Sequence, residues 1–161
     1  MPKFGPKPLT ERPGFLLSQV GFHSAELFSA GLAPLGLQPR HFGLLTQLAA
    51  ADGQSQQQLA DLLAIHRNAM VGLLDDLEVR GLVERRRHPR DRRAHAVHLT
   101  PSARRLLDRA TAIADAHDEK ILAPLDSAER RELVRLLQRV ADDSRLAPGV
   151  HPASAAPEQV R

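Results

Sequence analysis

The chemically most distinctive part of the chain is an arginine-rich segment at residues 80–100. It holds seven arginines and only two acidic residues, Glu84 and Asp91, which give it a net charge of +5. The whole chain of 161 residues carries +3, so the remainder sums to −2. Because the positive charge is concentrated in one place, the segment predicts a surface that binds a polyanion such as DNA.

The apolar residues of this segment predict a hairpin. Residues 82–83 open a first strand, residues 94–99 form a second, and Pro89-Arg90-Asp91 makes the turn between them. Arg93, near the tip, is the residue expected to enter the minor groove, whose potential is most negative in narrow A·T tracts. Asp91 is expected to orient that arginine through a charge-assisted hydrogen bond.

Four further arginines of the hairpin are predicted DNA contacts: Arg85, Arg87, Arg90 and Arg92. Of these, Arg90 and Arg92 are expected to contact phosphates. Side chains alternate along a strand, so at least one of the arginines 85–87 must point away from DNA or pair with Glu84. A merely solvated run of charge is the alternative, and the strong localisation of the charge argues against it.

Two short helices are predicted before the hairpin, and the break at Ile65-His66 is typical of a helix-turn-helix. The second helix, at about 67–79, is expected to lie in the major groove with four residues near base edges: His66, Arg67, Asn68 and Val71. Arginine can pair with guanine, asparagine with adenine, and valine can contact a thymine methyl. Three alternatives stay open: Arg67 contacts only phosphate, Asn68 only caps the helix, and His66 is a cap.

The first of these helices begins at Ser55, and Gln58 completes a capping-box pattern. Ser55, Gln56 and Gln57 are therefore expected at a helix start, where backbone N–H groups favour a phosphate. Capping alone explains the same residues equally well.

Helical periodicity on both sides of this core predicts a mainly α (α+β) fold, a winged helix-turn-helix at about 35–100 between terminal helices at about 14–33 and 101–143. The terminal helices carry more leucine, alanine and isoleucine than a small core needs, which predicts packing against a second copy of the chain. Residues 1–13 are expected to form a flexible arm and residues 148–161 a disordered tail.

The composition narrows the class of protein. The chain has no cysteine, so thiolate zinc sites and thiol redox sensing are excluded, and it has no Trp or Tyr for base-stacking platforms. It shows no glycine-rich phosphate loop, nucleophile elbow or paired carboxylates, so neither enzyme activity nor a cofactor is expected. No apolar run approaches the roughly 20 residues of a membrane span, which predicts a cytoplasmic protein without a membrane partner.

In this order and spacing, the motifs resemble those of MarR-type transcriptional regulators. Residues 88–100 resemble the family's wing signature of Asp-x-Arg, a short strand, and Leu-Thr opening a helix. Gln56-Gln57-Gln58-Leu59-Ala60 and Leu77-Glu78-x-Arg80-Gly81-Leu82-Val83 resemble its helix-turn-helix and the exit from the recognition helix. Residues 37–45 resemble the opening of its second helix, and the resemblance covers about 15–143.

The resemblance implies an obligate homodimer, joined through its first, fifth and sixth helices, that represses or activates transcription from a pseudo-palindromic operator. Many members release DNA when a small, often aromatic, anionic effector enters a cleft beside the DNA-binding lobe. Two departures matter: Gly72 stands where members often have a polar or basic residue, and the reactive cysteine of redox-sensing members is absent. A non-specific architectural DNA-binding protein and a winged helix that binds another protein are the competing hypotheses.

The eight histidines raise the question of a metal. None shows the His-x-x-x-His spacing that places two ligands on one helical face, so no metal ligand is assigned, although a zinc-responsive regulator of the same fold stays open. Polar residues of the helices around the implied cleft are expected to bind an anionic effector instead: His23, Arg40, His41 and His117.

Overall fold

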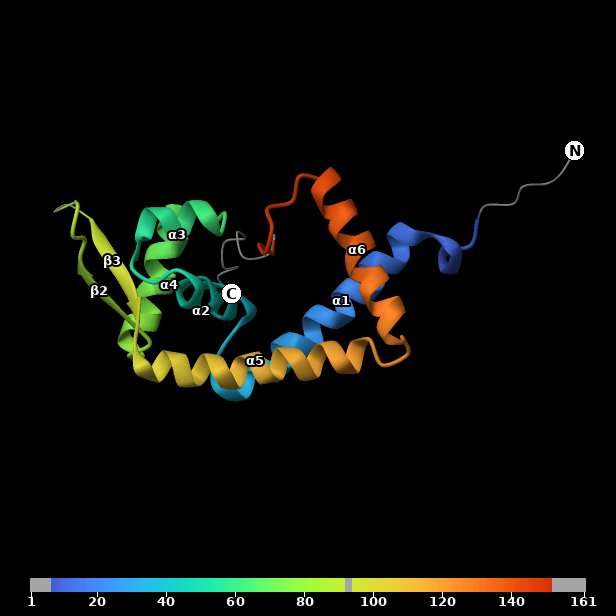
Figure 1. The fold of residues 1–161 in the computed structure, drawn as a ribbon, viewed down its shortest axis with the longest axis horizontal. Helices are drawn as coiled ribbons and strands as arrows, with labels where there is room; N and C mark the ends of the chain where they lie inside the picture. Colours follow the sequence, from blue (N-terminus) through green and yellow to red (C-terminus); the bar gives the residue numbers. More distant parts are fainter. Residues whose placement is uncertain (1–6, 92–93, 152–161) are drawn as a thin grey trace, which may run out of the picture.

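The computed structural model describes residues 7–91 and 94–151. Along them the elements are η1 (Leu9–Glu11), α1 (Pro13–Leu32), η2 (Ala33–Leu35), α2 (Pro39–Ala50), β1 (Gln54–Ser55), α3 (Gln56–Leu62), α4 (Arg67–Val79), β2 (Val83–Arg87), β3 (His95–Leu99), α5 (Pro101–Ile121) and α6 (Ser127–Asp143). Figure 1 shows an elongated molecule: α2, α3, α4 and the sheet form a lobe at one end, α1 and α6 lie toward the other, and α5 connects the two. The predicted fold class is confirmed.

The lobe is built around a leucine-rich core. Helix α4 buries Met70, Leu73, Leu74 and Leu77, which recur at helical spacing and form one face. Leu44, Leu45 and Leu48 of α2, Leu59 of α3 and Val97 of β3 are fully enclosed with them. Burying one such side chain stabilises the fold by about 1.5–3 kcal/mol, so this core fixes α4 firmly against the rest of the lobe.

The sheet has the strand order β1-β3-β2 and is antiparallel throughout. The hairpin predicted from the sequence is confirmed, with Val83 opposite Leu99 and Arg87 opposite His95. Strand β1 was not predicted, because two residues cannot display an alternating pattern. It exists through pairing with β3, which sets Gln54 opposite Val97 and so attaches the start of α3 to the hairpin.

Side-chain caps define where the helices begin, as the sequence indicated for α3 and α5. The hydroxyl of Thr100 accepts a hydrogen bond from the Ala103 amide at 3.1 Å and donates one to the Gly81 carbonyl at 2.7 Å. Gly81 ends α4 with a positive φ of 68°, a conformation that glycine adopts without strain. The end of α4 and the start of α5 are therefore fastened to each other.

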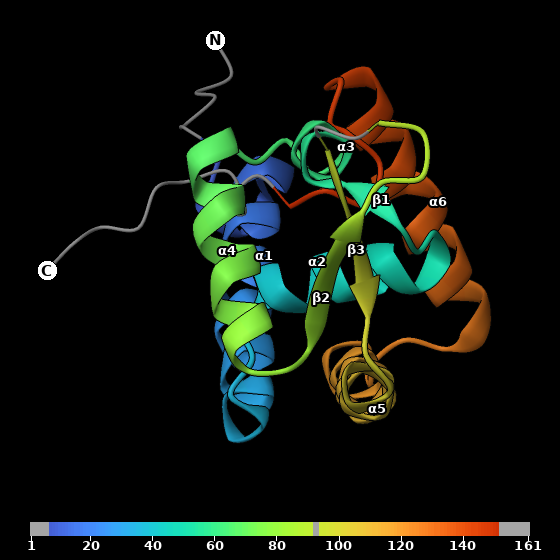
Figure 2. The ribbon, with the colours of Figure 1, turned by 90° about the vertical axis from the view of Figure 1, so that its left-hand side faces the viewer.

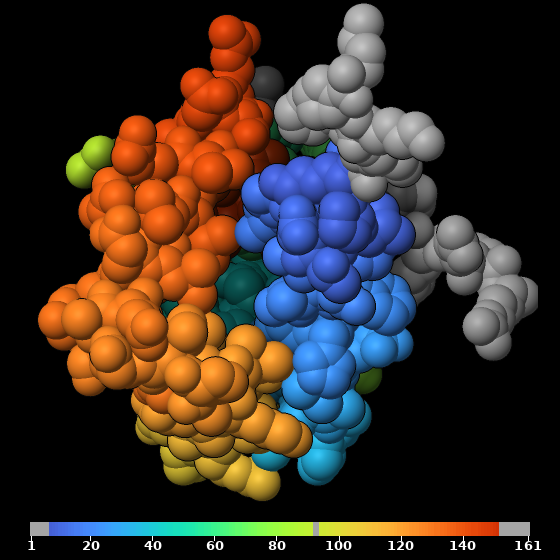
Figure 3. All heavy atoms as spheres, turned by 90° about the vertical axis from the view of Figure 1, so that its right-hand side faces the viewer, coloured from blue at the N-terminus to red at the C-terminus, as the bar shows by residue number. Residues whose placement is uncertain are grey.

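Helices α1 and α6 leave large apolar side chains in contact with solvent. Among the described residues of α6 none is buried, and Val134, Leu136, Leu137 and Val140 are 41–53% exposed. On α1, Phe15, Leu17, Val20 and Phe22 are 40–68% exposed. Figure 3 shows α1 and α6 side by side on one face, with a hollow between them.

The N-terminal arm differs from the sequence expectation in one respect: Leu9–Glu11 form η1, and α1 begins at Pro13, which suits the first helical position. The expectations for residues 1–6 and 152–161 lie outside the described residues. No helix within 7–91 and 94–151 combines the length and apolarity needed to cross a bilayer.

Candidate nucleic-acid interface

Helix α4 presents its polar face away from the core. Arg67 and Asn68 are exposed in its first turn, and Val71 is partly exposed one turn later. The Nδ1 atom of His66 accepts a hydrogen bond from the Asn68 amide at 3.3 Å, so His66 is the N-cap, one of the two roles expected for it. Figure 2 shows α4 beside the β2–β3 hairpin at one end of the molecule, as two adjacent projections.

The start of α3 has the capping box expected from the sequence. The Ser55 hydroxyl accepts from the Gln58 amide at 3.1 Å, and the Gln58 side chain accepts from the Ser55 amide at 2.8 Å. Gln57 donates to Asp61 at 2.7 Å, while Gln56 is partly exposed. The capping role of Ser55 is thus observed, and phosphate contacts by the three residues stay a prediction.

The hairpin approaches its tip with a regular pattern of backbone hydrogen bonds. The His88 amide donates to the Ala94 carbonyl at 3.0 Å, and the Ala94 amide donates to the Asp91 carbonyl at 3.1 Å. Arg87, Arg90 and Asp91 are exposed. Arg92, expected to contact phosphate, and Arg93, expected to enter the minor groove, lie outside the described residues, so both roles stay predictions.

Arg85 is not presented with these arginines. Its guanidinium binds Asp75 and Glu78 of α4, each at 2.6 Å, and its side chain is only 18% exposed. The adjacent Arg86 pairs with Glu84 on its own strand. As alternation along the strand predicted, an arginine of this run is engaged within the protein. That side chain is Arg85, one of the predicted DNA contacts, whose charge is paired with the carboxylates of α4.

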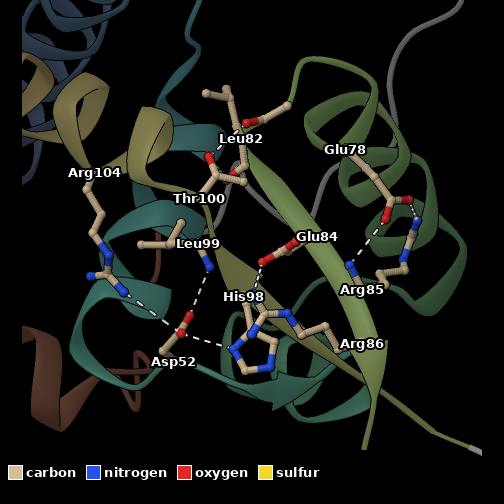
Figure 4. Close-up of polar contacts among 11 residues, drawn as sticks. Asp52, Glu78, Leu82, Glu84, Arg85, Arg86, His98, Leu99, Thr100 and Arg104 are labelled. Atoms are coloured by element: carbon tan, nitrogen blue, oxygen red, sulfur yellow. Dashed lines mark hydrogen bonds and ion pairs between the residues drawn. The ribbon is translucent and has the colours of Figure 1, made fainter.

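Asp52, in the turn before β1, holds the sheet in place beside α5 (Figure 4). One carboxylate oxygen accepts from the Leu99 amide at 2.9 Å, and the other lies 3.0 Å from His98 Nδ1 and 3.8 Å from the Arg104 guanidinium. Burial alone raises the pKa of Asp52, but these hydrogen bonds and the nearby positive charge outweigh it, so the pKa lies below the ordinary value.

Replacing Asp52 by asparagine is expected to lower the free energy of unfolding at pH 7 by about 0.5–1 kcal/mol, after allowance for solvent screening. A depressed folded-state pKa contributes stability that is present above the unfolded pKa, about 3.9, and is lost as the pH falls through the folded value. Urea unfolding of both proteins at several pH values should therefore show the difference shrinking below about pH 4. A difference that stays constant down to about pH 2.5 would contradict this role.

The residues expected to bind an effector do not share one environment. His41 is 6% exposed; its Nδ1 accepts from the Gln38 amide at 2.9 Å, and its Nε2 lies 3.6 Å from Asp76. It completes the cap of α2 and faces α4, so the structure gives it a structural role. Arg40 is partly exposed, and His23 is exposed on α1.

His117 of α5, by contrast, contacts α1 and is linked to α2 through Phe28. Its Nε2 lies 2.9 Å from the Ser24 hydroxyl, and its ring is 5.4 Å from that of Phe28, which in turn meets Phe42 edge-on at 5.5 Å. Aromatic carbon and hydrogen-bonding groups are therefore combined where the three helices meet. Among the described residues no group of three or more His, Asp or Glu side chains could hold a metal ion.

Comparison with known proteins relates this geometry to a family. The sequence pattern of the MarR family matches residues 35–94, from the approach to α2 through β2 and up to the residue before β3. An HTH-type transcriptional repressor of Mycobacterium tuberculosis is 35% identical over 130 residues, which are 81% of this chain and 94% of that protein. The chain belongs to the MarR family. It is a winged helix-turn-helix regulator of transcription that binds DNA, not an enzyme.

Solved MarR-type structures extend the agreement to the terminal helices. The transcriptional repressor CouR bound to a 23-mer DNA duplex matches with a TM-score of 0.75 and 36% identity, over 83% of this chain and 94% of that one. CouR of Rhodococcus jostii RHA1 bound to p-coumaroyl-CoA matches with a TM-score of 0.71 and 33% identity, over 84% and 96%. Both structures thus resemble this chain over the DNA-binding lobe and the surrounding helices.

Proposed function

We propose that the protein is a repressor that binds a pseudo-palindromic operator as a homodimer and releases it on binding an aromatic, anionic effector. The observation that carries the proposal is the lobe that presents the exposed Arg67–Asn68 face of α4 beside an arginine-rich hairpin. A similar chain in complex with a DNA duplex supports it.

The proposed DNA contacts divide by role. Arg67, Asn68 and Val71 read base edges in the major groove, with His66 capping the helix. Arg93, oriented by Asp91, enters the minor groove, while phosphates are bound by Arg87, Arg90, Arg92 and the start of α3 at Ser55, Gln56 and Gln57. Arg85 is left out of this set because its guanidinium already binds two carboxylates.

The homodimer is proposed from the uncovered apolar faces of α1 and α6. A single exposed leucine or valine is common on protein surfaces. Several at helical spacing on two adjacent helices indicate a surface that is buried in an assembly. A twofold dimer would also place two α4 helices for two half-sites.

The proposed effector site is where α1, α2 and α5 meet. His117 and Ser24 supply hydrogen bonds, Phe28 and Phe42 supply aromatic surface, and Arg40 and His23 lie on the same helices as candidates for an anionic group. The complex of the similar CouR with p-coumaroyl-CoA supports an aromatic acid derivative as the class of ligand.

Selection of bound sequences from a random pool of duplex DNA tests the DNA-binding part of the proposal. We expect an enriched inverted repeat with half-site centres about 10 bp apart, one turn of DNA. Binding that falls steeply with salt but enriches no sequence would favour the architectural alternative.

Arg67→Ala is expected to weaken binding to the enriched site by about 1–3 kcal/mol and to relax preference at one symmetric pair of base positions. The measurement is affinity for a panel of single-base variants of that site. Lys120→Ala, which removes an exposed cation from the last turn of α5, is the matched control and should leave the preference intact. A uniform loss on every sequence would make Arg67 a phosphate contact.

A further inference from the structure

Helix α4 carries an unfavourable charge for a helix that lies in DNA. Its thirteen residues include one arginine and three carboxylates, Asp75, Asp76 and Glu78, a net charge of −2. The carboxylates occupy its C-terminal half, where the helix dipole also disfavours negative charge.

Two of these carboxylates continue the face proposed to read bases. Asp75 follows Asn68 by seven residues and Glu78 follows Val71 by seven, a spacing of almost two full turns. Their side chains are 58% and 41% exposed. Left uncompensated, two negative charges would stand next to the phosphates that flank the groove.

Arg85 compensates both carboxylates at once. Its two terminal nitrogens bind different partners, Asp75 and Glu78, each at 2.6 Å, and its backbone amide donates to Glu78 at 3.2 Å (Figure 4 shows the Glu78 contacts). Burial lowers the pKa of Arg85, but its hydrogen bonds to the two carboxylates outweigh that effect, so its pKa lies above the ordinary value and the charge is permanent.

We propose that Arg85 is a positioning residue for DNA recognition: from β2 it neutralises Asp75 and Glu78, so that α4 can enter a groove lined by phosphates. The inference rests on the proposed binding of operator DNA. It assigns Arg85 a role distinct from that of Arg87 and Arg90, because its charge is used inside the protein. The planar guanidinium presents a separate nitrogen to each carboxylate in a fixed fork, a geometry that the single ammonium nitrogen of lysine does not reproduce.

The test is a double-mutant cycle of the full chain with the parent, Arg85→Gln, Asp75→Asn/Glu78→Gln, and the combined protein. Affinity is measured on the selected inverted repeat and on an unrelated duplex of equal length. We expect Arg85→Gln to weaken binding at least about tenfold in the parent, and by less than about threefold when the carboxylates are already neutral. Equal losses in both backgrounds would mean that Arg85 contacts DNA directly and would overturn the inference.

Salt dependence separates neutralisation from a merely structural effect. Repulsion between carboxylates and phosphates is screened, so the loss caused by Arg85→Gln should shrink between about 50 and about 200 mM salt. A loss that is independent of salt would reflect a misplaced helix and would also overturn the inference. Arg86→Gln, the same change at the exposed neighbouring position, should have the same effect in both backgrounds.

Urea unfolding establishes that each variant is folded under the assay conditions. If Arg85→Gln is not, Arg85→Lys replaces it; that variant should lose an intermediate amount of affinity in the parent and none when both carboxylates are neutral. If the parent itself binds neither duplex, the proposed function fails and the inference falls with it. That outcome is distinct from the one in which the parent binds DNA but Arg85→Gln weakens binding equally in the parent and in the protein with neutral carboxylates.

Discussion

Placing aspartates at Leu136 and Val140 of α6 is expected to convert the proposed dimer to a monomer. Both side chains are more than 40% exposed in the single chain and lie one turn apart on a helix with no buried residue. A folded monomer is expected because these side chains contribute little to the core. Light scattering after size-exclusion chromatography measures the mass directly.

The same change should weaken binding to an inverted repeat by about two orders of magnitude or more, because the second half-site is then bound independently. Circular dichroism and a retained thermal transition should show that the lobe stays folded. Gln138→Asp adds one negative charge at an exposed polar position of the same helix and serves as the control. A dimer of unchanged stability in the double variant would disprove the interface on α6.

Arg93→Ala is expected to weaken operator binding by about 1–2 kcal/mol for each wing, or roughly 10²-fold for a dimer that inserts two. The reason is the loss of a guanidinium from a narrow minor groove, whose potential is strongly negative. Dimer mass and thermal stability should not change, since the strand pairing of the hairpin joins residues 83–87 to 95–99 and does not include residue 93.

Arg93→Lys keeps the charge and removes the planar fork. It should retain non-specific binding and lose part of the preference for A·T-rich sequence beside the half-sites, measured with site variants at fixed salt. If Arg93→Ala leaves operator affinity unchanged, the minor-groove role belongs to another residue of the segment.

Much of the fold could be predicted because local signals and tertiary packing agree. The leucine spacing of α4, the Thr100–Pro101 start of α5 and the Ser55–Gln58 cap all indicate elements that the structure contains. Strand β1 could not be predicted, since its formation depends on β3, more than forty residues away in the chain, and not on its own two residues.

The roles of the site residues were harder to predict from the sequence, because the role of a side chain depends on the partner that it contacts in the folded protein. His41 is of a residue type that often binds ligands, yet it stands three positions after Gln38 and completes the capping box of α2. The three-residue spacing of a capping box was present in the sequence at the start of α2. The pairing of Arg85 with Asp75 spans ten residues and two elements, and alternation along β2 indicates only that some arginine turns inward. The placement of Ser24 beside His117 depends on how α1 lies along α5.

Helix α5 is continuous for 21 residues, about 31 Å, and runs from its fastening at the end of α4 past the contact of His117 with α1. A rod of that length acts as a lever: a tilt of about 5° at one end displaces the other by about 3 Å. Two such rods swinging in opposite senses would change the separation of a pair of recognition helices by about 5 Å, a large error against a half-site spacing of about 34 Å. An event at the His117 end therefore needs only to alter an angle, with every core contact of the lobe preserved, to put both helices out of step with the DNA.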